Sequence, residues 1–344
     1  MAGGPDSVEV SCDRICYCPD CEKITLLVPF RADNPQRAKV WQWLMRYWKH
    51  ELPDAELIVC TDDSRPFCKA AAFNRGFETA KGGIIVLLDA DCYIRGPVIQ
   101  DCAHKIWSSA RRGIPLWYVP YRRFYRLNET ASKRLMASDP ADPVRFPDPP
   151  AHGDVEQPET ASTGHWWGAL IQIMPQEAFA EAGGMDERFR GWGGEDVSFM
   201  LAVDTLYGKH KTSNNPVCHV WHPTIIDAAK GFSRMWEYQQ SAGPNDYLAK
   251  LYRRARGDAE AMRTVAGRPA LKRRRQHECQ APAGHCGASH GTQALRSSGA
   301  DIGLPGPAPV AAERSMPPGW SSLRGVRTRL RALTWFLTPL VQIR

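Results

Sequence analysis

The sequence predicts an α/β protein with a mixed, mostly parallel sheet. From Ile24 onward, apolar blocks typical of strands alternate with helical blocks, an order that favours parallel strands joined by right-handed crossovers. The run Ile84–Leu88 is apolar at every position, as in a strand covered on both faces. At 344 residues the chain can bury a substantial core without disulfide support.

The elements of the first half follow in a regular order. A strand is expected at 24–30 (ITLLVPF), followed by a helix in which Asn34 is the N-cap and Pro35 takes the first helical position. The sequence AELIVCT then predicts a second strand, CKAAAFNRGFETA a second helix and GIIVLLDAD a third strand.

A proline-rich stretch separates this half from the next. It carries six prolines and no periodicity, so we expect a mobile loop over about residues 137–165. A second block starts at Trp166 with a strand in WWGALIQIM and a helix around 176–182. A glycine-rich turn (GGMDERFRGWGGED), a helix (DVSFMLAVDTLYG) and a strand (VCHVWHP) follow.

Composition divides the chain into three segments. Residues 1–23 hold four cysteines, residues 24–263 carry the α/β pattern, and residues 264–344 are rich in Gly, Pro, Ala, Ser and Arg, which predicts a disordered tail. The tail contains 12 of the 44 Lys+Arg and 3 of the 37 Asp+Glu, so its net charge is +9 and that of residues 1–263 is −2. This distribution argues against a nucleic-acid-binding core.

Cysteine usage and hydropathy bear on the compartment. The 11 cysteines are an odd number and no signal-peptide pattern precedes them, so we expect a cytoplasmic protein. The cysteines of the first segment lack the spaced pairs of a zinc site, and free thiols are the favoured interpretation. No run of 18 apolar residues occurs; the last stretch, LRALTWFLTPLVQIR, fits either a peripheral contact with the inner face of the membrane or an unstructured end.

Two carboxylates follow directly after the third expected strand. Asp89 and Asp91 end the run GGIIVLLDAD, and ligands of open α/β sheets gather at the carboxyl ends of strands. The two side chains converge on one cation if the strand geometry continues that far, whereas a lone D-x-D is more often a solvated turn. A histidine from CHVWH would complete an oxygen and nitrogen site suited to Mn2+ and tolerant of Mg2+.

The turn GWGGED has the parts that sugar chemistry needs. Its glycines let the backbone approach a ligand, and Trp192 offers a face on which a sugar ring can stack. Glu195 and Asp196 can accept hydrogen bonds from hydroxyls, and one of them could act as general base. The alternative interpretation, two acids that complement the dipole at a helix start, is compatible with that role.

Together these motifs resemble those of a known family. The order VPFRADN, FCKAAAFNRGF, VLLDADCYI, GGMDERFRGWGGEDVSF and CHVWHP is similar to that of the GT-A glycosyltransferases. The resemblance is to the group with a galactosyltransferase-type C-terminal region, which includes the β-1,4-galactosyltransferases, the polypeptide N-acetylgalactosaminyltransferases and many bacterial family 2 enzymes. It covers about residues 24–225, and it implies a Rossmann-like nucleotide-sugar half followed by an acceptor-binding half.

The resemblance also implies roles on the donor side. The residues implied to contact the nucleotide sugar are Pro29, Phe30, Arg31, Phe67, Lys69 and Asp89. Lys69 stands where the family has Arg, so a point charge replaces a bidentate diphosphate clamp. Asp91 and His219 are the implied metal ligands, with His222 as the less favoured choice.

On the acceptor side, the resemblance implies that Trp192 closes over donor and acceptor, that Glu195 holds the acceptor sugar and that Asp196 is the base. Where galactosyltransferases continue with two more aspartates, this chain has Val197 and Ser198, so the acceptor is not specified. The implied reaction is transfer of a hexose from a UDP-sugar to a hydroxyl of a glycan, lipid-linked or protein acceptor, with inversion.

Two other classes of function stay open. A carbohydrate or nucleotide-sugar binding protein that has lost turnover would share these motifs, and a metal-dependent activity test discriminates it from an enzyme. A nucleotidyltransferase usually has a glycine-rich, basic loop near the first strand, and VPFRADNPQRAKV offers no glycine there.

Overall fold

The computed structural model describes residues 22–32, 34–156, 170–191, 193–223 and 235–267. The chain divides into two units, Met1–Glu278 and Cys279–Arg344, and the second lies wholly outside the described residues. The cysteines of residues 1–21, Trp192 and the expected disordered tail with its membrane-contact stretch also lie outside them.

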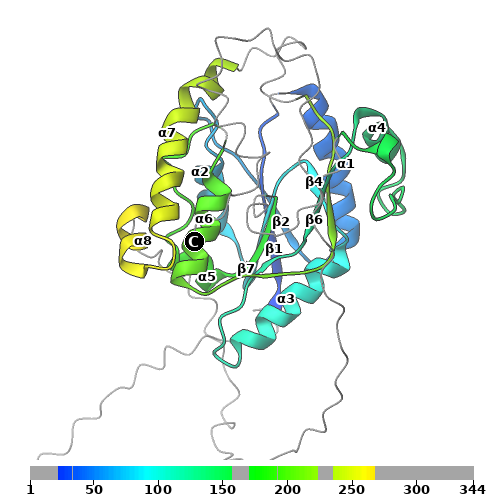
Figure 1. Cartoon of the computed structure of the whole chain (residues 1–344). Coiled ribbons are helices and arrows are strands. Elements are labelled where there is room, and N and C mark those ends of the chain that lie inside the picture. Colours follow the sequence, from blue (N-terminus) through cyan, green and yellow to red (C-terminus); the bar gives the residue numbers. More distant parts are fainter. Residues whose placement is uncertain (1–21, 33, 157–169, 192, 224–234, 268–344) are drawn as a thin grey trace, which may run out of the picture. The chain divides into compact units, whose positions relative to one another are not determined.

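A six-stranded sheet forms the centre of the first unit (Figure 1). In spatial order its strands are β2 (Glu56–Cys60), β1 (Ile24–Pro29), β3 (Ile84–Leu88), β7 (Ile171–Pro175), β5 (Tyr118–Val119) and β8 (Lys211–Thr212). The pairs β1–β2, β1–β3 and β5–β8 are parallel, whereas β7 runs antiparallel to both β3 and β5. The expected mixed, mostly parallel α/β sheet is therefore confirmed.

Helices cover both faces of this sheet. Figure 1 shows α2, α5 and α6 on one side of the strands and α1 and α3 on the other. The helices are α1 (Pro35–Glu51), α2 (Lys69–Thr79), α3 (Gly96–Ala110), α4 (Glu129–Ala137), α5 (Gln176–Glu181), α6 (Glu195–Leu206), α7 (Met235–Arg254) and α8 (Ala259–Ala266). All five residues of β3 are buried, as the uniformly apolar run predicts.

A second, three-stranded sheet pairs two strands from the middle of the chain with a strand from its later part. Its order is β4 (Cys92–Tyr93), β9 (Pro216–His219) and β6 (Arg123–Arg126). In the antiparallel pairing of β4 with β9, Cys92 lies opposite His219, and the backbone N–H of Val220 donates to Asp91 O at 2.7 Å. This pairing fixes the chain just after β3 against the expected histidine strand.

The segment after α4 is held by contacts as far as the structure describes it. Asp148 pairs with Arg123 at 2.7 Å and accepts from the hydroxyl of Tyr125 at 3.0 Å, and Val155 forms a β-bridge with Leu127. Residues 138–156 are thus anchored to β6 and its continuation. The mobile loop expected at about 137–165 stays a prediction for residues 157–165, which are not described.

The folded part runs past the expected boundary at residue 263. Helix α8 continues to Ala266, which is buried, and Gly267 caps it with φ of 62°. The carbonyl oxygen of Val265 accepts a hydrogen bond from Arg188. Composition alone placed the boundary too early, because the last turn of α8 (RTVA) is short and polar on one side.

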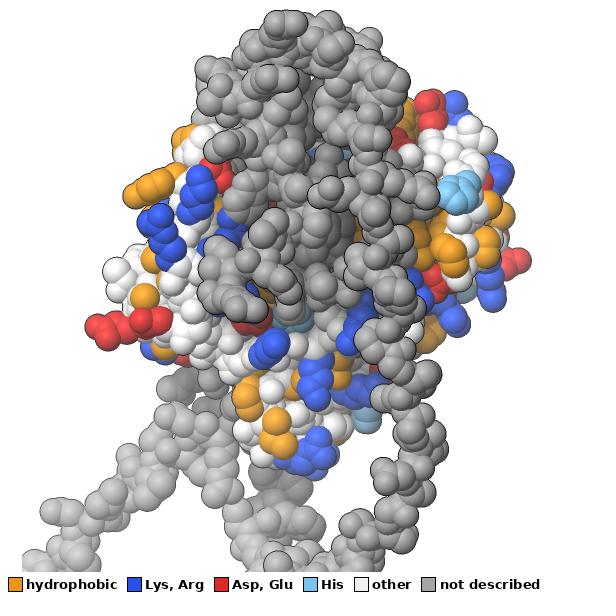
Figure 2. Space-filling view, viewed as in Figure 1, with side chains coloured by type: hydrophobic (Ala, Val, Ile, Leu, Met, Phe, Trp, Pro, Cys, Tyr) orange, Lys and Arg blue, Asp and Glu red, His pale blue; other side chains and the backbone are white. Residues whose placement is uncertain are grey.

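The surface of the described residues carries both signs of charge. Figure 2 shows Lys and Arg side chains interspersed with Asp and Glu over the parts of this face that are not grey. That mixture agrees with the small net charge of residues 1–263. Among the described helices, none combines the length and the apolar character needed to cross a bilayer.

Candidate active site

Asp89 and Asp91 do not converge on one point, as they would if the strand continued. Strand β3 ends at Leu88, and residues 90 and 91 form a turn. Asp89 pairs with Lys69, whereas Asp91 faces two histidines. The condition for a shared cation is therefore not met, the two carboxylates belong to two adjacent clusters, and the donor contact of Asp89 stays a prediction.

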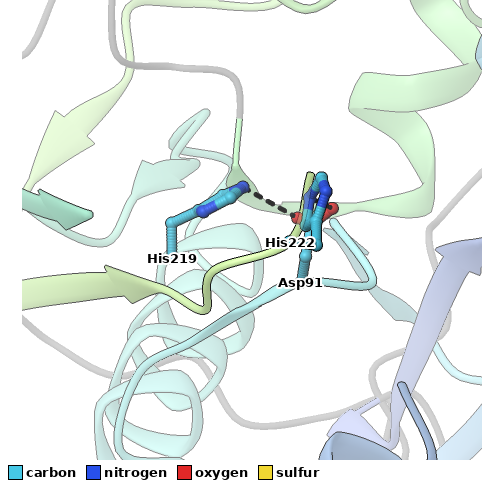
Figure 3. A group of neighbouring side chains, drawn as sticks. All are labelled: Asp91, His219 and His222. Atoms are coloured by element: carbon cyan, nitrogen blue, oxygen red, sulfur yellow. Dashed lines mark hydrogen bonds and ion pairs between the residues drawn. The ribbon is translucent and has the colours of Figure 1, made fainter. Parts of the chain in front are cut away.

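The first cluster is the trio of Asp91, His219 and His222, which we call the metal trio (Figure 3). One ligand atom from each residue lies within 4.8 Å of the other two. His222 Nε2 lies 3.1 Å from Asp91 Oδ2, and His219 Nε2 lies 3.7 Å from Asp91 Oδ1. The structure thus places His222 beside His219, and both histidines are candidate ligands.

Burial and neighbouring charges prepare the metal trio to bind a cation. Burial lowers the pKa of His219 to about 3, so its imidazole is neutral and has a free lone pair. Burial alone would raise the pKa of Asp91, but His219, His222 and the Arg37 guanidinium reverse this and hold it well below its usual range. One carboxylate and two imidazoles fit a divalent ion such as Mn2+.

The second cluster surrounds the ammonium group of Lys69. Its Nζ lies 2.6 Å from Asp89 Oδ1, 2.9 Å from Asp196 Oδ1 and 3.7 Å from Glu195 Oε1. We call these four residues the lysine cluster. Burial opposes the charge on Lys69, yet the attraction of Asp196, Asp89 and Glu195 raises its pKa well above the usual value. Lys69 is therefore a permanent cation that holds three carboxylates together.

Two carboxylates of the lysine cluster, Asp196 and Asp89, are more basic than ordinary ones. Burial, followed by the charge of Glu195, raises the pKa of Asp196 well above 3.8, although Lys69 acts in the opposite direction. Burial likewise raises the pKa of Asp89 to about 6. A carboxylate with a raised pKa accepts a proton more readily, which suits the role of general base expected for Asp196.

A glycine-rich turn sets Glu195 and Asp196 at the start of α6. Gly194 is the N-cap with φ of 93°, a left-handed conformation that favours glycine. The N–H of Gly191 donates to Phe67 O at 3.0 Å, which ties this turn to the segment before α2. This link brings the two acids to Lys69, the first residue of α2.

The expected donor residues gather at the carboxyl end of β1. The Arg31 guanidinium lies over the Phe67 ring, 5.1 Å from its centroid, and donates to the Ser64 carbonyl at 2.8 Å. Phe30 packs on Trp41 with ring centroids 5.8 Å apart, and Pro29 is the last residue of β1. The ammonium of Lys69 pairs with three carboxylates, and its expected contact with the diphosphate stays a prediction.

Two further residues of this region had not been expected. Asp62 is 5% exposed, accepts from the N–H groups of Ser64 and Cys68 at 3.1 and 3.0 Å, and pairs with Arg75. It holds together the segment before α2. The other is Arg37, 3.3 Å from Asp91. The position of Asp62 just after a strand could have marked it as a site residue. No spacing pattern in the sequence marks Arg37 in this way.

A family model described as the N-terminal domain of galactosyltransferase matches residues 159–203. The described part of this segment runs from β7 into α6 and includes Glu195 and Asp196. The match confirms the resemblance that the motifs indicated, and it indicates a glycosyltransferase enzyme. No curated protein matches the chain in sequence.

Solved structures of glycosyltransferases are similar to the chain at low identity. The catalytic domain of Drosophila β1,4-galactosyltransferase 7 with xylobiose is 18% identical over 58% of this chain and 71% of that one, with a TM-score of 0.33. A mutant of the Drosophila enzyme with manganese, UDP-Gal and xylobiose is 16% identical over 61% and 79%, with a TM-score of 0.33. GalNAc-T7 with UDP, GalNAc and Mn2+ is 15% identical over 72% and 55%, with a TM-score of 0.35.

Proposed function

We propose that this glycosyltransferase moves a hexose from a UDP-sugar to a hydroxyl of a glycan, lipid-linked or protein acceptor, with a divalent metal and with inversion. The observation that carries the proposal is the adjacency of the metal trio and the lysine cluster, which the run Asp89–Ala90–Asp91 joins. A cation site next to basic carboxylates is what transfer from a nucleoside diphosphate to a hydroxyl requires.

The donor would lie along the metal trio and the carboxyl end of β1. Asp91, His219 and His222 would hold Mn2+, or Mg2+ in its place. A bound divalent ion supplies the positive charge that stabilises the departing diphosphate. Arg31 and Phe67, which already stack on each other, would contact the nucleotide, and this part of the proposal depends on the family resemblance.

The transfer step would use the lysine cluster. The acceptor oxygen attacks the anomeric carbon, and the bond from that carbon to the diphosphate oxygen breaks with its electron pair remaining on the diphosphate. The hydroxyl proton passes to Asp196, whose raised pKa favours its capture. Glu195 would accept hydrogen bonds from the acceptor sugar. A single displacement from the face opposite the leaving group inverts the anomeric centre.

Lys69 gives this arrangement a fixed geometry. Three closely spaced carboxylates with little exposure to solvent repel one another, and the ammonium at 2.6 to 3.7 Å from each offsets that repulsion. It therefore keeps Asp196 oriented and opposes the rise of its pKa that burial and Glu195 cause. We assign Lys69 as a positioning residue that acts through Asp196.

Titration with a panel of UDP- and GDP-sugars, with and without Mn2+, tests the proposal. Heat release or thermal shift should show one UDP-sugar whose affinity rises when Mn2+ is present, and hydrolysis or transfer of that sugar should follow. The same affinity with and without Mn2+ across the panel would contradict the proposal. Manganese-dependent binding without turnover on any acceptor would instead support the binding-protein alternative.

A further inference from the structure

Arg37 lies beside the metal trio without belonging to it. Its Nη2 lies 3.3 Å from Asp91 Oδ2. The first turn of α1 fixes its backbone, because Asn34 Oδ1 accepts from the N–H groups of Gln36 and Arg37 at 2.8 and 3.2 Å. Asn34 is itself buried, so the start of α1 is firmly placed against the site.

The guanidinium of Arg37 has donor capacity left over. Within the described part of the chain, Asp91 is its one acidic partner, and its Nε is buried without a hydrogen-bond partner. The side chain is 25% exposed, so a ligand can reach it. A second cation nearby, Lys69, is already shared by three carboxylates. Arg37 is thus the better placed of the two to meet an added oxyanion.

The formal charges of the metal trio and Arg37 determine how favourably a divalent ion can bind beside them. The metal trio contributes one negative charge, from Asp91, because imidazoles bind metals in the neutral form. Arg37 already balances that charge. A divalent ion would therefore give the group formed by the metal trio and Arg37 an excess of two positive charges, before the adjacent lysine cluster is counted. A nucleoside diphosphate brings roughly two negative charges or more at neutral pH and restores the balance.

We propose that Arg37 couples the two ligands: it weakens binding of the divalent ion alone and strengthens binding of the ion together with the donor's diphosphate. The inference depends on the proposed function, since it takes the metal trio as the ion site. Thermodynamic linkage makes the coupling reciprocal. The ion must therefore raise the affinity for the diphosphate by the same factor by which the diphosphate raises the affinity for the ion. The site then fills with metal and diphosphate together instead of holding metal alone.

Titration of the full-length chain with Mn2+ at neutral pH, followed by the electron paramagnetic resonance signal of free Mn2+, tests this coupling. Wild type and Arg37→Gln are compared with and without saturating UDP. We expect Arg37→Gln to bind Mn2+ alone about tenfold more tightly, because a nearby like charge is removed. The factor by which UDP tightens Mn2+ should fall by about tenfold in the same variant.

Two variants control for charge and for folding. Arg37→Lys keeps the positive charge and should keep weak binding of Mn2+ alone. Arg46→Gln removes an exposed charge from the same helix and should match wild type. Unchanged or weaker binding of Mn2+ alone in Arg37→Gln, with a native circular dichroism spectrum, would overturn the inference.

The same titration separates this inference from the proposed function. If wild type binds no Mn2+ even with UDP, or if Asp91→Asn binds it as wild type does, the metal trio is not the ion site and the proposed function fails. If Asp91→Asn loses Mn2+ while Arg37→Gln behaves as wild type, only the role of Arg37 is refuted.

Discussion

The Nζ of Lys69 lies 2.9 Å from Oδ1 of Asp196, across 127 residues of sequence. Lys69 opens α2 in the first half of the α/β fold, and Asp196 lies in the first turn of α6 in the second half. The pair therefore joins the two halves at the point where the transfer is proposed to occur. Lys69, which the family resemblance places near the donor's diphosphate, pairs with the candidate base.

The pH dependence of transfer should depend on the pKa of Asp196 and therefore on its pairing with Lys69. Asp196 must be ionised to accept a proton, so kcat/KM falls as pH drops through its pKa, which burial and Glu195 raise above 3.8 and Lys69 lowers. Lys69→Met should therefore move the acid limb of the pH profile to higher pH, whereas Lys69→Arg should leave it near its wild-type place. An unmoved limb in Lys69→Met would contradict the assigned role.

Asp196→Asn should separate binding from chemistry. The amide keeps the shape of the side chain but cannot take the acceptor proton, so transfer should fall by about 10² to 10⁴. Donor affinity, measured by calorimetry with Mn2+, should stay within a few-fold of wild type. Full transfer activity in this variant would mean that another group is the base.

Gly76→Ala should destabilise the fold, although alanine is the better helix former by about 1 kcal/mol. A Cβ at this position of α2 would overlap Cys60 Sγ on β2 and lie 3.3 Å from Leu27 Cδ2. We expect a net loss of about 1 to 2 kcal/mol in the free energy of unfolding, measured by urea denaturation. Cys60→Ala in the same background should recover part of that loss, and no recovery would contradict this packing account.

The position of the folded boundary can be tested by two truncations. Removing residues 268–344 leaves α8 and its cap Gly267 intact, so the Tm and the transfer rate should match those of the full chain. Removing residues 264–344 deletes the Val265 carbonyl that accepts from Arg188 and the buried Ala266, so the Tm should fall by several degrees. Equal Tm values for both truncations would place the boundary before α8 ends.

Most of the fold could be predicted because local signals agree with tertiary structure. Asn34 and Pro35 start α1 as expected, and the uniformly apolar run of β3 is buried throughout. The antiparallel insertion of β7 between β3 and β5 could not be foreseen, because an apolar strand of five residues carries no mark of its direction.

The sequence named the residues of the candidate site, but it did not show how they divide into two clusters. The motifs indicated Asp91, His219 and Asp196. Because β3 ends at Leu88, Asp89 lies in a different cluster from Asp91. The role of Arg37 depends on the packing of the first turn of α1 against the site, a contact between segments that no local pattern encodes.

The most direct test of the whole account is calorimetric titration of UDP into wild type and Asp91→Asn, each with Mn2+ and with EDTA. Asp101→Asn, an exposed carboxylate on α3, serves as the matched control. We predict that Mn2+ tightens UDP binding by more than about tenfold in wild type and in the control, and that Asp91→Asn loses this dependence. Equal manganese dependence in Asp91→Asn and wild type would contradict the metal trio and, with it, the proposed reaction.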